Sequence, residues 1–430
     1  MAEIKISPPA GTNKYISFDP GPVTQMTGLA GVKFDFNYGA RVQVPKGNYH
    51  VRFINKETNT VIYESDASDM VVASPLKYFI NYQINLYLDG KLILSQGLAL
   101  EHKKVCLLYM SYALGDNIAW IPYAQEFQQK HNCQVYCSIK SELADIFKPA
   151  YPELKFIKRA EIPKDCYATY YISLFYPADD RYHQPSDFRK LRMQGNIPSI
   201  LGLKQVERQT VLKATSKERK IKEPYVCIAA QASGQAKYWN NPRGWWETVA
   251  YLKSLGYRVL CIDKNKWYGI NRHWQIIPYG AEDWTGDIPL QERINLLAQA
   301  DFFIGLPSGL AWLAWGIGIP VILISGFTMP DYEFSTPYRI TNKNVCYGCW
   351  NAPGIVFNNK DFGWCPRQQN TPREYECTYN ISVEQVCQTI NQVIKDKHLK
   401  TSVEPSDAGL KQYLLSAEKK SVRHRVTDIR

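Results

Sequence analysis

Hydrophobic and polar residues alternate over short distances in the first hundred positions, as they do in β-strands. The runs VRFIN and TVIYE flank the turn-rich KETN, and INLYL and KLILS flank Asp89-Gly90, whose residues tolerate the positive φ angles of a tight hairpin. No helix-length period occurs there, and no set of His, Cys or paired carboxylates suggests catalysis. We predict a β-rich domain over residues 1–100, used for assembly, for partner binding or as a plain structural cap.

A different alternation begins at Lys104, where short apolar strands take turns with longer amphipathic segments. KKVCLLYM, QVYCSI and TYYISLF are followed, after a charged break, by YVCIAAQ, YRVLCID, DFFIGL and PVILISG. This pattern is typical of parallel α/β layers. We predict an α/β protein with two Rossmann-like layers, 101–222 and 223–400, and a tail over 401–430. The glycosyltransferase B plan and a two-domain binding protein both fit this pattern.

The run from Phe302 to Pro330 has no charged residue, and its length exceeds the roughly 20 residues that span a bilayer. Glycines and prolines divide it into strand, turn, short helix and strand, which is how a buried parallel-sheet unit reads. No transmembrane segment is therefore predicted. The start of the chain, MAEIKISPPA, lacks the pattern of a signal peptide, which predicts a cytoplasmic protein.

Four cysteines near the C-terminus have the spacing C-x2-C-x15-C-x11-C in a segment rich in Gly, Pro and Trp. A C-x2-C turn and two thiolates from later strands suit a tetrahedral structural metal site, and ligand type alone favours zinc. Disulfides or scattered buried thiols are the alternative. We predict a metal-binding segment over 340–380 with the ligands Cys346, Cys349, Cys365 and Cys377.

The other seven cysteines lie mostly in apolar runs, where a thiol behaves as a small hydrophobe. Cys387 is the one competitor for the metal set, but it has helical spacing with Val383, Val386 and Ile390. All seven are predicted to be core residues: Cys106, Cys133, Cys137, Cys166, Cys227, Cys261 and Cys387.

The chain has 430 residues and a formal net charge of +11, which favours anionic ligands. Nucleic acid is the weaker candidate because the basic residues are dispersed without an arginine-rich run. A phosphorylated substrate fits the same charge.

The string SYALGDN, residues 111–117, ends a predicted strand and opens a helix. Asp116 is therefore expected at the carboxyl edge of the first sheet, where α/β folds collect their chemistry. A carboxylate there could take a proton from an acceptor hydroxyl. The alternative is a helix N-cap.

Two further strings follow strands of the second layer. QASGQAKYWNNPRGW, residues 231–245, places Lys237 beside small residues, where a diphosphate leaving group would develop negative charge; the alternative is a solvated surface lysine. DWTGD, residues 283–287, precedes GLPSGLAW, residues 305–312, in which Ser308 and Gly309 are expected at a helix N-terminus that favours phosphate oxygens.

In this order the strings resemble the ADP-heptose-dependent inverting glycosyltransferases that build lipopolysaccharide core. The resemblance rests on Gly234 to Trp239 with Pro242 and Trp245, on Asp283 to Gly286, and on the Gly-rich helix start. Those enzymes typically have Asp-Thr-Gly followed by His at the helix start. This chain has Pro307, Ser308, Gly309 and Trp312 instead, so those side-chain contacts are not carried over.

Over nearly its whole length the chain resembles the bacterial autotransporter heptosyltransferases, through FDFNYGARV, ESDAS, LDGKLILSQG, CYGCW and WCPRQQNTPREYECT. The resemblance implies transfer of heptose from ADP-heptose to serines of an autotransporter adhesin passenger before export. It also implies a dodecameric ring of identical subunits, and iron rather than zinc on the four cysteines.

The mechanism that the resemblance implies is a single displacement with inversion at the anomeric carbon. Asp116 would be the general base, and Lys237 with the Ser308-Gly309 helix start would stabilise the departing ADP. Gly234, Thr285 and Gly286 would shape the donor pocket, and the metal would be structural. Two alternatives remain open: lipopolysaccharide core as the acceptor, or an inactive scaffold that binds nucleotide sugar.

Overall fold

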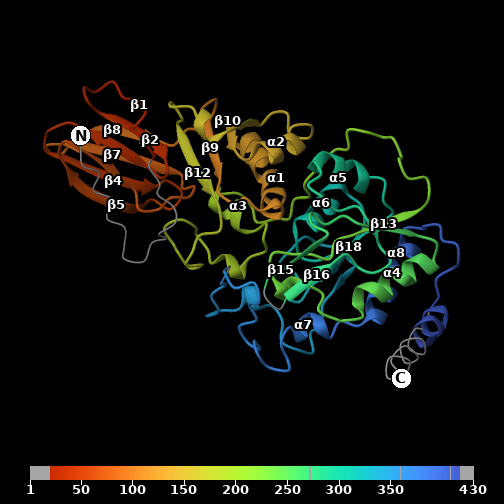
Figure 1. The fold of residues 1–430 in the computed structure, drawn as a ribbon. Helices are drawn as coiled ribbons and strands as arrows, with labels where there is room; N and C mark the ends of the chain where they lie inside the picture. The colour runs from red at the N-terminus through yellow and green to blue at the C-terminus, as the bar shows by residue number, and fades with distance from the viewer. Residues whose placement is uncertain (1–19, 271–272, 359, 407, 417–430) are drawn as a thin grey trace. The chain divides into compact units, whose positions relative to one another are not determined.

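The computed structural model describes residues 20–270, 273–358, 360–406 and 408–416. It divides the chain into two compact units, Met1–Arg208 and Gln209–Arg430. The first unit contains a mixed sheet and the second a parallel sheet, each with helices packed on it, shown in red to yellow-green for the first unit and in green to blue for the second (Figure 1). The predicted mixed α/β class is confirmed.

The main sheet of the first unit joins strands of the β-rich region to strands of the first α/β layer. Its order is β11-β10-β9-β12-β2-β3-β6, and β1 pairs with β2. β12 runs parallel to β9 on one side and to β2 on the other, whereas β2, β3 and β6 pair antiparallel. The bounds are β1 Gln25–Met26, β2 Lys33–Asn37, β3 Arg41–Val44, β6 Met70–Ala73, β9 Lys104–Tyr109, β10 Gln134–Ser138, β11 Lys155–Ile157 and β12 Ala168–Ile172.

This pairing means that one sheet continues across residue 100. Phe36 of β2 and Ala168 of β12 are register partners, and Phe36 N donates to Tyr167 O at 2.9 Å. The domain limits drawn from the sequence at 100 and 222 stay predictions.

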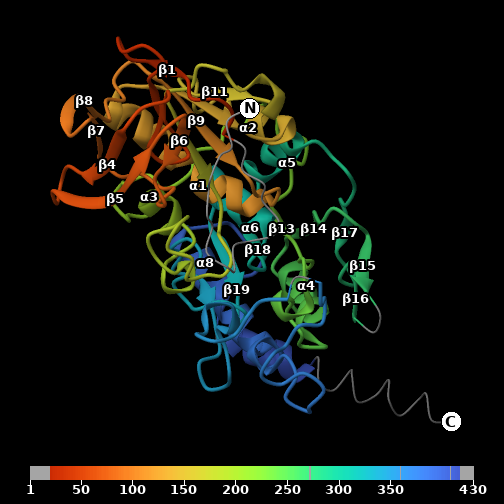
Figure 2. The same cartoon turned by 90° about the vertical axis from the view of Figure 1, so that its left-hand side faces the viewer.

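The remaining strands of the β-rich region form a separate four-stranded antiparallel sheet, β5-β4-β7-β8, seen as a distinct group of strands in Figure 2. Both predicted hairpins are present. Asp89 and Gly90 join β7 to β8 with φ angles of 50° and 81°, which is the conformation that favours this dipeptide. The bounds are β4 Tyr49–Asn55, β5 Thr60–Ala67, β7 Tyr82–Leu88 and β8 Lys91–Gly97.

Three α-helices accompany the first main sheet. α1 contacts β10, α2 contacts β11, and α3 contacts both β12 and α1. The inner face of α1 is apolar and fully buried, including Trp120, Tyr123 and Phe127, which explains why this long segment forms a helix against the sheet. The bounds are α1 Leu114–His131, α2 Ser141–Phe147 and α3 Asn196–Ile200.

The second unit is built on a six-stranded parallel sheet of order β17-β14-β13-β18-β19-β20. The chain starts near the centre with β13, moves outward through β14 to β17, then returns to the other side of β13 with β18. A two-stranded antiparallel ribbon, β15-β16, is inserted between β14 and β17. The bounds are β13 Tyr225–Ile228, β14 Arg258–Cys261, β15 Trp267–Ile270, β16 His273–Ile276, β17 Glu282–Asp283, β18 Phe303–Gly305, β19 Val321–Ile324 and β20 Arg339–Ile340.

Helices complete the second unit. α4 and α8 pack on each other, and α8 begins with a capping box in which Ser382 Oγ accepts from Gln385 N. Cys387 is fully buried in α8, as predicted. The bounds are α4 Gly244–Ser254, α5 Leu290–Leu297, α6 Gly309–Ile317, α7 Glu376–Tyr379 and α8 Val383–Asp396.

The sequence also predicted a C-terminal tail and no transmembrane segment. Part of the predicted tail packs on the second core, where Leu410 is 2% exposed; residues 407 and 417–430 lie outside the described residues, as does the MAEIKISPPA start. Within the described ranges no helix combines the length and apolar character needed to cross a bilayer. The uncharged run from Phe302 contains the nine-residue helix α6 between two strands.

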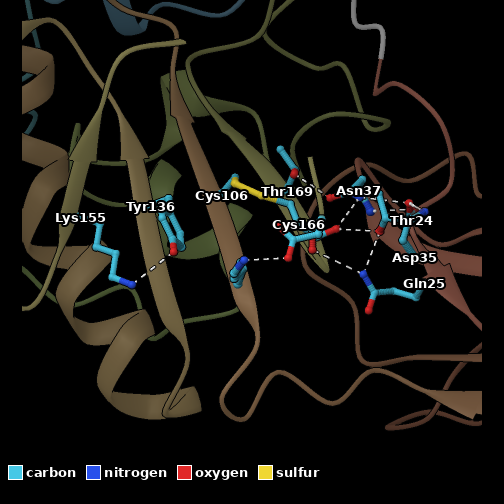
Figure 3. Close-up of a disulfide and its surroundings, with 11 residues drawn as sticks. Thr24, Gln25, Asp35, Asn37, Cys106, Tyr136, Lys155, Cys166 and Thr169 are labelled. Atoms are coloured by element: carbon cyan, nitrogen blue, oxygen red, sulfur yellow. Dashed lines mark hydrogen bonds and ion pairs between the residues drawn. A yellow bond between two sulfur atoms is a disulfide. The ribbon is translucent and has the colours of Figure 1, made fainter. Parts of the chain in front are cut away.

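Two of the seven cysteines predicted as core thiols are joined in a disulfide, Cys106–Cys166 (Figure 3). Both are buried core residues, as predicted, but the bond between them was not predicted from the sequence. They lie on or beside the adjacent strands β9 and β12, and their Cα atoms are 6.5 Å apart, within the range that a disulfide spans. Cys133, Cys137, Cys227, Cys261 and Cys387 are free and buried.

Candidate active site

Asp116 lies at the carboxyl edge of the first main sheet, as predicted. β9 leads directly to α1, and the next strand of the sheet on the other side of β9 is β12. The chain therefore reverses its direction of travel between β9 and β12. In open α/β sheets such a reversal leaves a crevice outside the strand ends, where ligands bind.

The surroundings of Asp116 exclude the N-cap alternative, because Ala113 occupies the N-cap of α1 and Asp116 is the third helical residue. Ser111 Oγ donates to Asp116 Oδ2 at 2.5 Å and accepts from Ala113 N at 3.1 Å. Ser111 thus connects the end of β9 to the carboxylate. Burial and the nearby charge of Asp116 both raise the pKa of Tyr176, which comes from the loop after β12. The carboxylate is partly exposed.

The predicted donor-binding residues all lie on connections that leave the carboxyl edge of the second sheet. Because β13, β14, β17 and β18 are mutually parallel, their carboxyl ends meet at one edge. β13 and β18 flank the point where the strand order reverses. The loop after β13 contains Gly234 and Lys237, and the connection after β18 contains Ser308 and Gly309, so these residues border the position where this type of sheet binds ligands.

Lys237 ends a short 3-10 helix, Gln235–Lys237. Its Nζ lies 3.3 Å from Ser233 Oγ and 5.2 Å from the centre of the Phe327 ring. A backbone hydrogen bond from Gln235 N to Phe362 O, at 2.8 Å, holds the loop in place. The lysine is only partly exposed, which disfavours the interpretation as a freely solvated surface residue.

Ser308 is the N-cap of α6, and Gly309 is the first residue of that helix. Among the described residues, Ser308 Oγ is a buried atom without a hydrogen-bond partner. The first N–H groups of a helix also lack partners within the helix and carry its positive dipole end. This position is therefore suited to phosphate oxygens.

Thr285 and Gly286 follow β17. Thr285 N and Oγ1 both donate to Asp283 Oδ1, at 3.1 Å and 2.6 Å. Gly286 has φ 132°, and its N–H donates to Lys264 O at 3.0 Å. A glycine suits this backbone because a side chain would strain it.

Two buried charged residues at this edge were not singled out in the sequence. Asp263 follows β14 and is 2% exposed, and Arg293 of α5 is 4% exposed. Asp263 Oδ2 accepts from Ala230 N at 2.8 Å, and Arg293 donates to the carbonyl oxygens of Trp284, Asp263 and Gly286. The sequence signal that could have indicated Asp263 is a carboxylate at the end of the strand-like run YRVLCID. Arg293 lies in a helix, and no sequence signal indicated its role.

The four cysteines of the predicted metal segment are all free. Cys365 lies outside any helix or strand and Cys377 lies in α7, so the expectation that later strands supply two of the ligands is wrong. Burial, followed by the charges of the other three cysteines, raises the pKa of Cys377, so the thiols affect one another. Among the described residues, however, no group of three or more His, Cys, Asp or Glu side chains is arranged to hold a metal ion.

A cavity of about 370 Å³ is lined in part by the cysteine-rich segment, residues 340–380, and none of the predicted catalytic, donor or metal residues lines it. Its walls come from the β15-β16 ribbon and from the loop before α7: Ile270, His273, Asp361, Phe362, Gln369 and Asn370. Lys237, Thr285 and Ser308 thus share an edge of one sheet, while Asp116 belongs to the other unit.

Family models match two stretches of the chain. Residues 28–90 match the N-terminal domain of the glycosyltransferase TibC, and residues 183–360 match glycosyltransferase family 9, the heptosyltransferases.

Curated relatives match over most of their length. The chain is 43% identical over 404 residues to the autotransporter heptosyltransferase TibC of Escherichia coli O78:H11, which covers 93% of this chain and 98% of TibC. It is 46% identical to the autotransporter heptosyltransferase Aah of Escherichia coli, covering 84% and 92%. At 34% identity, covering 90% and 92%, it also matches BimC of Burkholderia thailandensis, which is described as an inactive autotransporter heptosyltransferase.

Solved structures of TibC share the fold with a TM-score of 0.85, covering 88% of this chain and 100% of TibC. One shows an iron-containing dodecamer at 43% identity, and another shows TibC in complex with ADP-D-beta-D-heptose at 42% identity. The high identity over nearly complete chains extends the resemblance seen in the motifs. The chain belongs to the TibC-type autotransporter heptosyltransferases of glycosyltransferase family 9.

Proposed function

We propose that this protein transfers heptose from ADP-heptose to serine hydroxyls of an autotransporter adhesin passenger, with inversion at the anomeric carbon. The observation that carries the proposal is the placement of Lys237 and of the α6 N-terminus on either side of the strand-order reversal in the second sheet. A relative with 42% identity and the same fold binds ADP-D-beta-D-heptose.

The donor half of the reaction uses the second unit. Lys237 and the start of α6, where Ser308 is the N-cap and Gly309 supplies the first helical N–H, stabilise the negative charge that develops on the diphosphate as ADP departs. Gly234 lets the backbone of its loop approach the donor, and Thr285 and Gly286 form another wall of the pocket. The buried Ser308 Oγ gains a phosphate oxygen as its hydrogen-bond partner.

The acceptor half uses the first unit. The Asp116 carboxylate takes the proton of the serine hydroxyl while the serine oxygen attacks the anomeric carbon. The bond between that carbon and the diphosphate oxygen breaks, and ADP leaves with the electron pair. A single displacement of this kind inverts the configuration at the anomeric carbon.

The proposal also covers metal, assembly and compartment. Cys346, Cys349, Cys365 and Cys377 hold one iron ion, with zinc as the alternative, and the ion stabilises the segment without taking part in transfer. Support comes from the four free thiols and from the iron-containing dodecamer of TibC. The protein assembles as a dodecamer and acts in the cytoplasm, before the adhesin is exported.

Intact-mass spectrometry tests the central claim. A purified adhesin passenger fragment is incubated with ADP-heptose and either the native protein, Asp116→Asn, or Asp145→Asn. Asp145 is a matched control because it lies on α2 of the same unit with its side chain 67% exposed. Native protein and the control variant should add one heptose for each modified site, and Asp116→Asn should add none within the same time.

The outcomes separate the possibilities. Equal gain with Asp116→Asn would remove Asp116 from the general-base role. No gain with native protein would exclude adhesin transfer; a parallel reaction with lipopolysaccharide core as acceptor then tests the rival enzyme function. The inactive relative BimC favours one further candidate, a non-catalytic scaffold, for which native protein would bind ADP-heptose yet modify neither acceptor.

A further inference from the structure

The carboxylate of Asp263 is buried beneath the loop that contains Gly234 and Lys237. Its Oδ2 accepts from Ala230 N at 2.8 Å and its Oδ1 from Gln231 N at 3.3 Å. These are the two residues that lead from β13 into the donor loop. With 2% of its surface exposed, Asp263 holds the start of this loop from the protein side.

Arg293 holds the neighbouring loop in a similar way. Its guanidinium, on the buried side of α5, donates to Gly286 O at 2.7 Å, to Trp284 O at 3.3 Å and to Asp263 O at 3.1 Å. The Arg293 guanidinium therefore connects the loop after β17, which contains Thr285 and Gly286, to Asp263, which holds the loop after β13. Arginine suits this role because its N–H groups have a fixed fork geometry.

We propose that Asp263 and Arg293 are positioning residues that fix the spacing of the two donor loops before the nucleotide binds. Both side chains are buried, and each acts through hydrogen bonds to backbone groups of the loops. The inference rests on the proposed donor site and adds the residues that preorganise it. Preorganised loops lose less conformational freedom on binding, so disordering them weakens nucleotide affinity.

Burial makes Asp263 sensitive to pH near neutrality. Burial raises its pKa to about 6, against the lowering effects of the Ala230 and Gln231 N–H groups, the Cys261 thiol and Arg293. The other titratable groups that affect this pair are Tyr238, Cys227 and Asp287. Protonation places a hydrogen on one oxygen and weakens its capacity to accept from the loop.

Isothermal titration calorimetry with ADP tests the proposal without requiring heptose transfer. Native protein is compared with Asp263→Asn, Asp263→Ala, Arg293→Lys and Arg293→Ala, each below its unfolding transition. Loss of a hydrogen bond to a charged group predicts an increase in Kd of roughly 10-fold to 100-fold for the alanine variants. Asparagine and lysine retain part of the interaction and should give smaller increases.

Asp35→Asn is the matched control. Asp35 is also a fully buried aspartate that accepts two backbone N–H groups, from Thr24 and Asn37, and it pairs with Arg41, but it lies in the first unit. Its loss should lower stability and leave the Kd for ADP unchanged. Unchanged Kd in folded Asp263→Ala and Arg293→Ala would overturn the positioning role, as would an equal rise in Asp35→Asn.

The pH dependence gives a readout that a purely structural role would not move. ADP itself takes up a proton in this range, so the quantity compared is the difference between native protein and Asp263→Asn. This difference in affinity should shrink as pH falls from 7 to 5, because native protein then loses the ionised carboxylate that the variant lacks throughout. Since the folded-state pKa of Asp263 is raised, protonation of Asp263 favours the folded state, so weaker binding at pH 5 is not caused by unfolding through this group.

A difference in affinity that stays constant from pH 7 to pH 5 would overturn the proposal. Native protein that binds no ADP at any pH would instead refute the proposed donor site itself, and the inference with it.

Discussion

At the residue scale, the position of Lys237 indicates what a lysine contributes at the donor edge. An ammonium is a compact charge on a flexible stem, and here Nζ lies over the Phe327 ring and close to Ser233 Oγ. In the proposed donor site, this side chain would follow the diphosphate as its charge increases. Such a role suits the point charge of a lysine ammonium better than the planar guanidinium of an arginine.

We predict that Lys237→Gln lowers kcat/KM for heptose transfer by about 100-fold to 1,000-fold, the loss typical when one stabilising group for a developing anion is removed. Steady-state kinetics with ADP-heptose and a passenger fragment measure it. Lys395→Gln, an exposed lysine in the last turn of α8, should leave kcat/KM unchanged. A Lys237→Gln enzyme with native kcat/KM would show that the helix N-terminus stabilises the leaving group alone.

At the element scale, the cysteine-rich segment supports the donor loop. Ala236, next to Lys237, packs in a buried cluster with Phe327, Trp364, Cys365 and Tyr375, and Phe362 O accepts from Gln235 N. The segment has little regular secondary structure of its own. A metal ion that closes its loops would therefore also stabilise the floor of the donor loop.

We predict that Cys349→Ser loses bound iron and binds ADP more weakly, because the segment beneath Gln235 loosens. Elemental analysis by mass spectrometry reports iron per chain, and calorimetry reports the Kd. Cys387→Ser, a buried thiol of α8 outside the set, should retain iron. Zinc in the native protein would correct the choice of metal, and full iron content in Cys349→Ser would exclude this cysteine as a ligand.

The β7-β8 hairpin offers a second test at this scale. Gly90 has φ 81°, and a Cβ there would meet no atom within 4 Å, so the cost of Gly90→Ala comes from the backbone alone. We predict a loss of about 1 to 2 kcal/mol in the free energy of unfolding of this region. Gly28→Ala is the control, because Gly28 is equally uncrowded and has no positive φ. Denaturant unfolding followed by hydrogen exchange in β7 and β8 compares the two; equal effects would contradict the backbone explanation.

At the scale of the whole molecule, the second unit keeps its sheet within one continuous part of the chain, whereas the first main sheet combines strands from two regions that the sequence pattern distinguishes. The second unit contains all six strands of its parallel sheet within Gln209–Arg430. The first main sheet takes β1, β2, β3 and β6 from the β-rich region. Its α/β strands alone would leave one side of β12 unpaired.

We predict that a fragment of residues 209–430 folds cooperatively, whereas a fragment of residues 101–208 does not, because its sheet lacks four strands and an exposed strand edge invites aggregation. Thermal unfolding by circular dichroism and size-exclusion chromatography compare them with a 20–208 fragment, which should fold. A soluble, cooperatively unfolding 101–208 fragment would contradict this.

Local patterns in the sequence predicted most elements, because strand alternation, helical periodicity and turn dipeptides act over a few residues. The Asp89-Gly90 hairpin, the strand-to-helix position of Asp116 and the α6 N-terminus at Ser308 were all predictable on that basis. The pairing of β2 with β12 and the Cys106–Cys166 disulfide join positions far apart in the chain, and no local pattern encodes such contacts. Arg293 was missed for the same reason, since its partners lie on other elements.

The placement of β2 between β3 and β12 leaves part of a strand edge uncovered while the chain is being synthesised. Phe36 and its register partner Ala168 are separated by most of the first unit, so β2 leaves the ribosome long before the strand that covers its open side. During that interval β1 covers Lys33 and Phe34 on this side of β2, whereas Phe36 and Asn37 still lack the strand that pairs with them. A cell that makes this protein must protect that edge until β12 emerges, and codon changes or pauses between these strands should affect the yield of folded protein more than changes after residue 208.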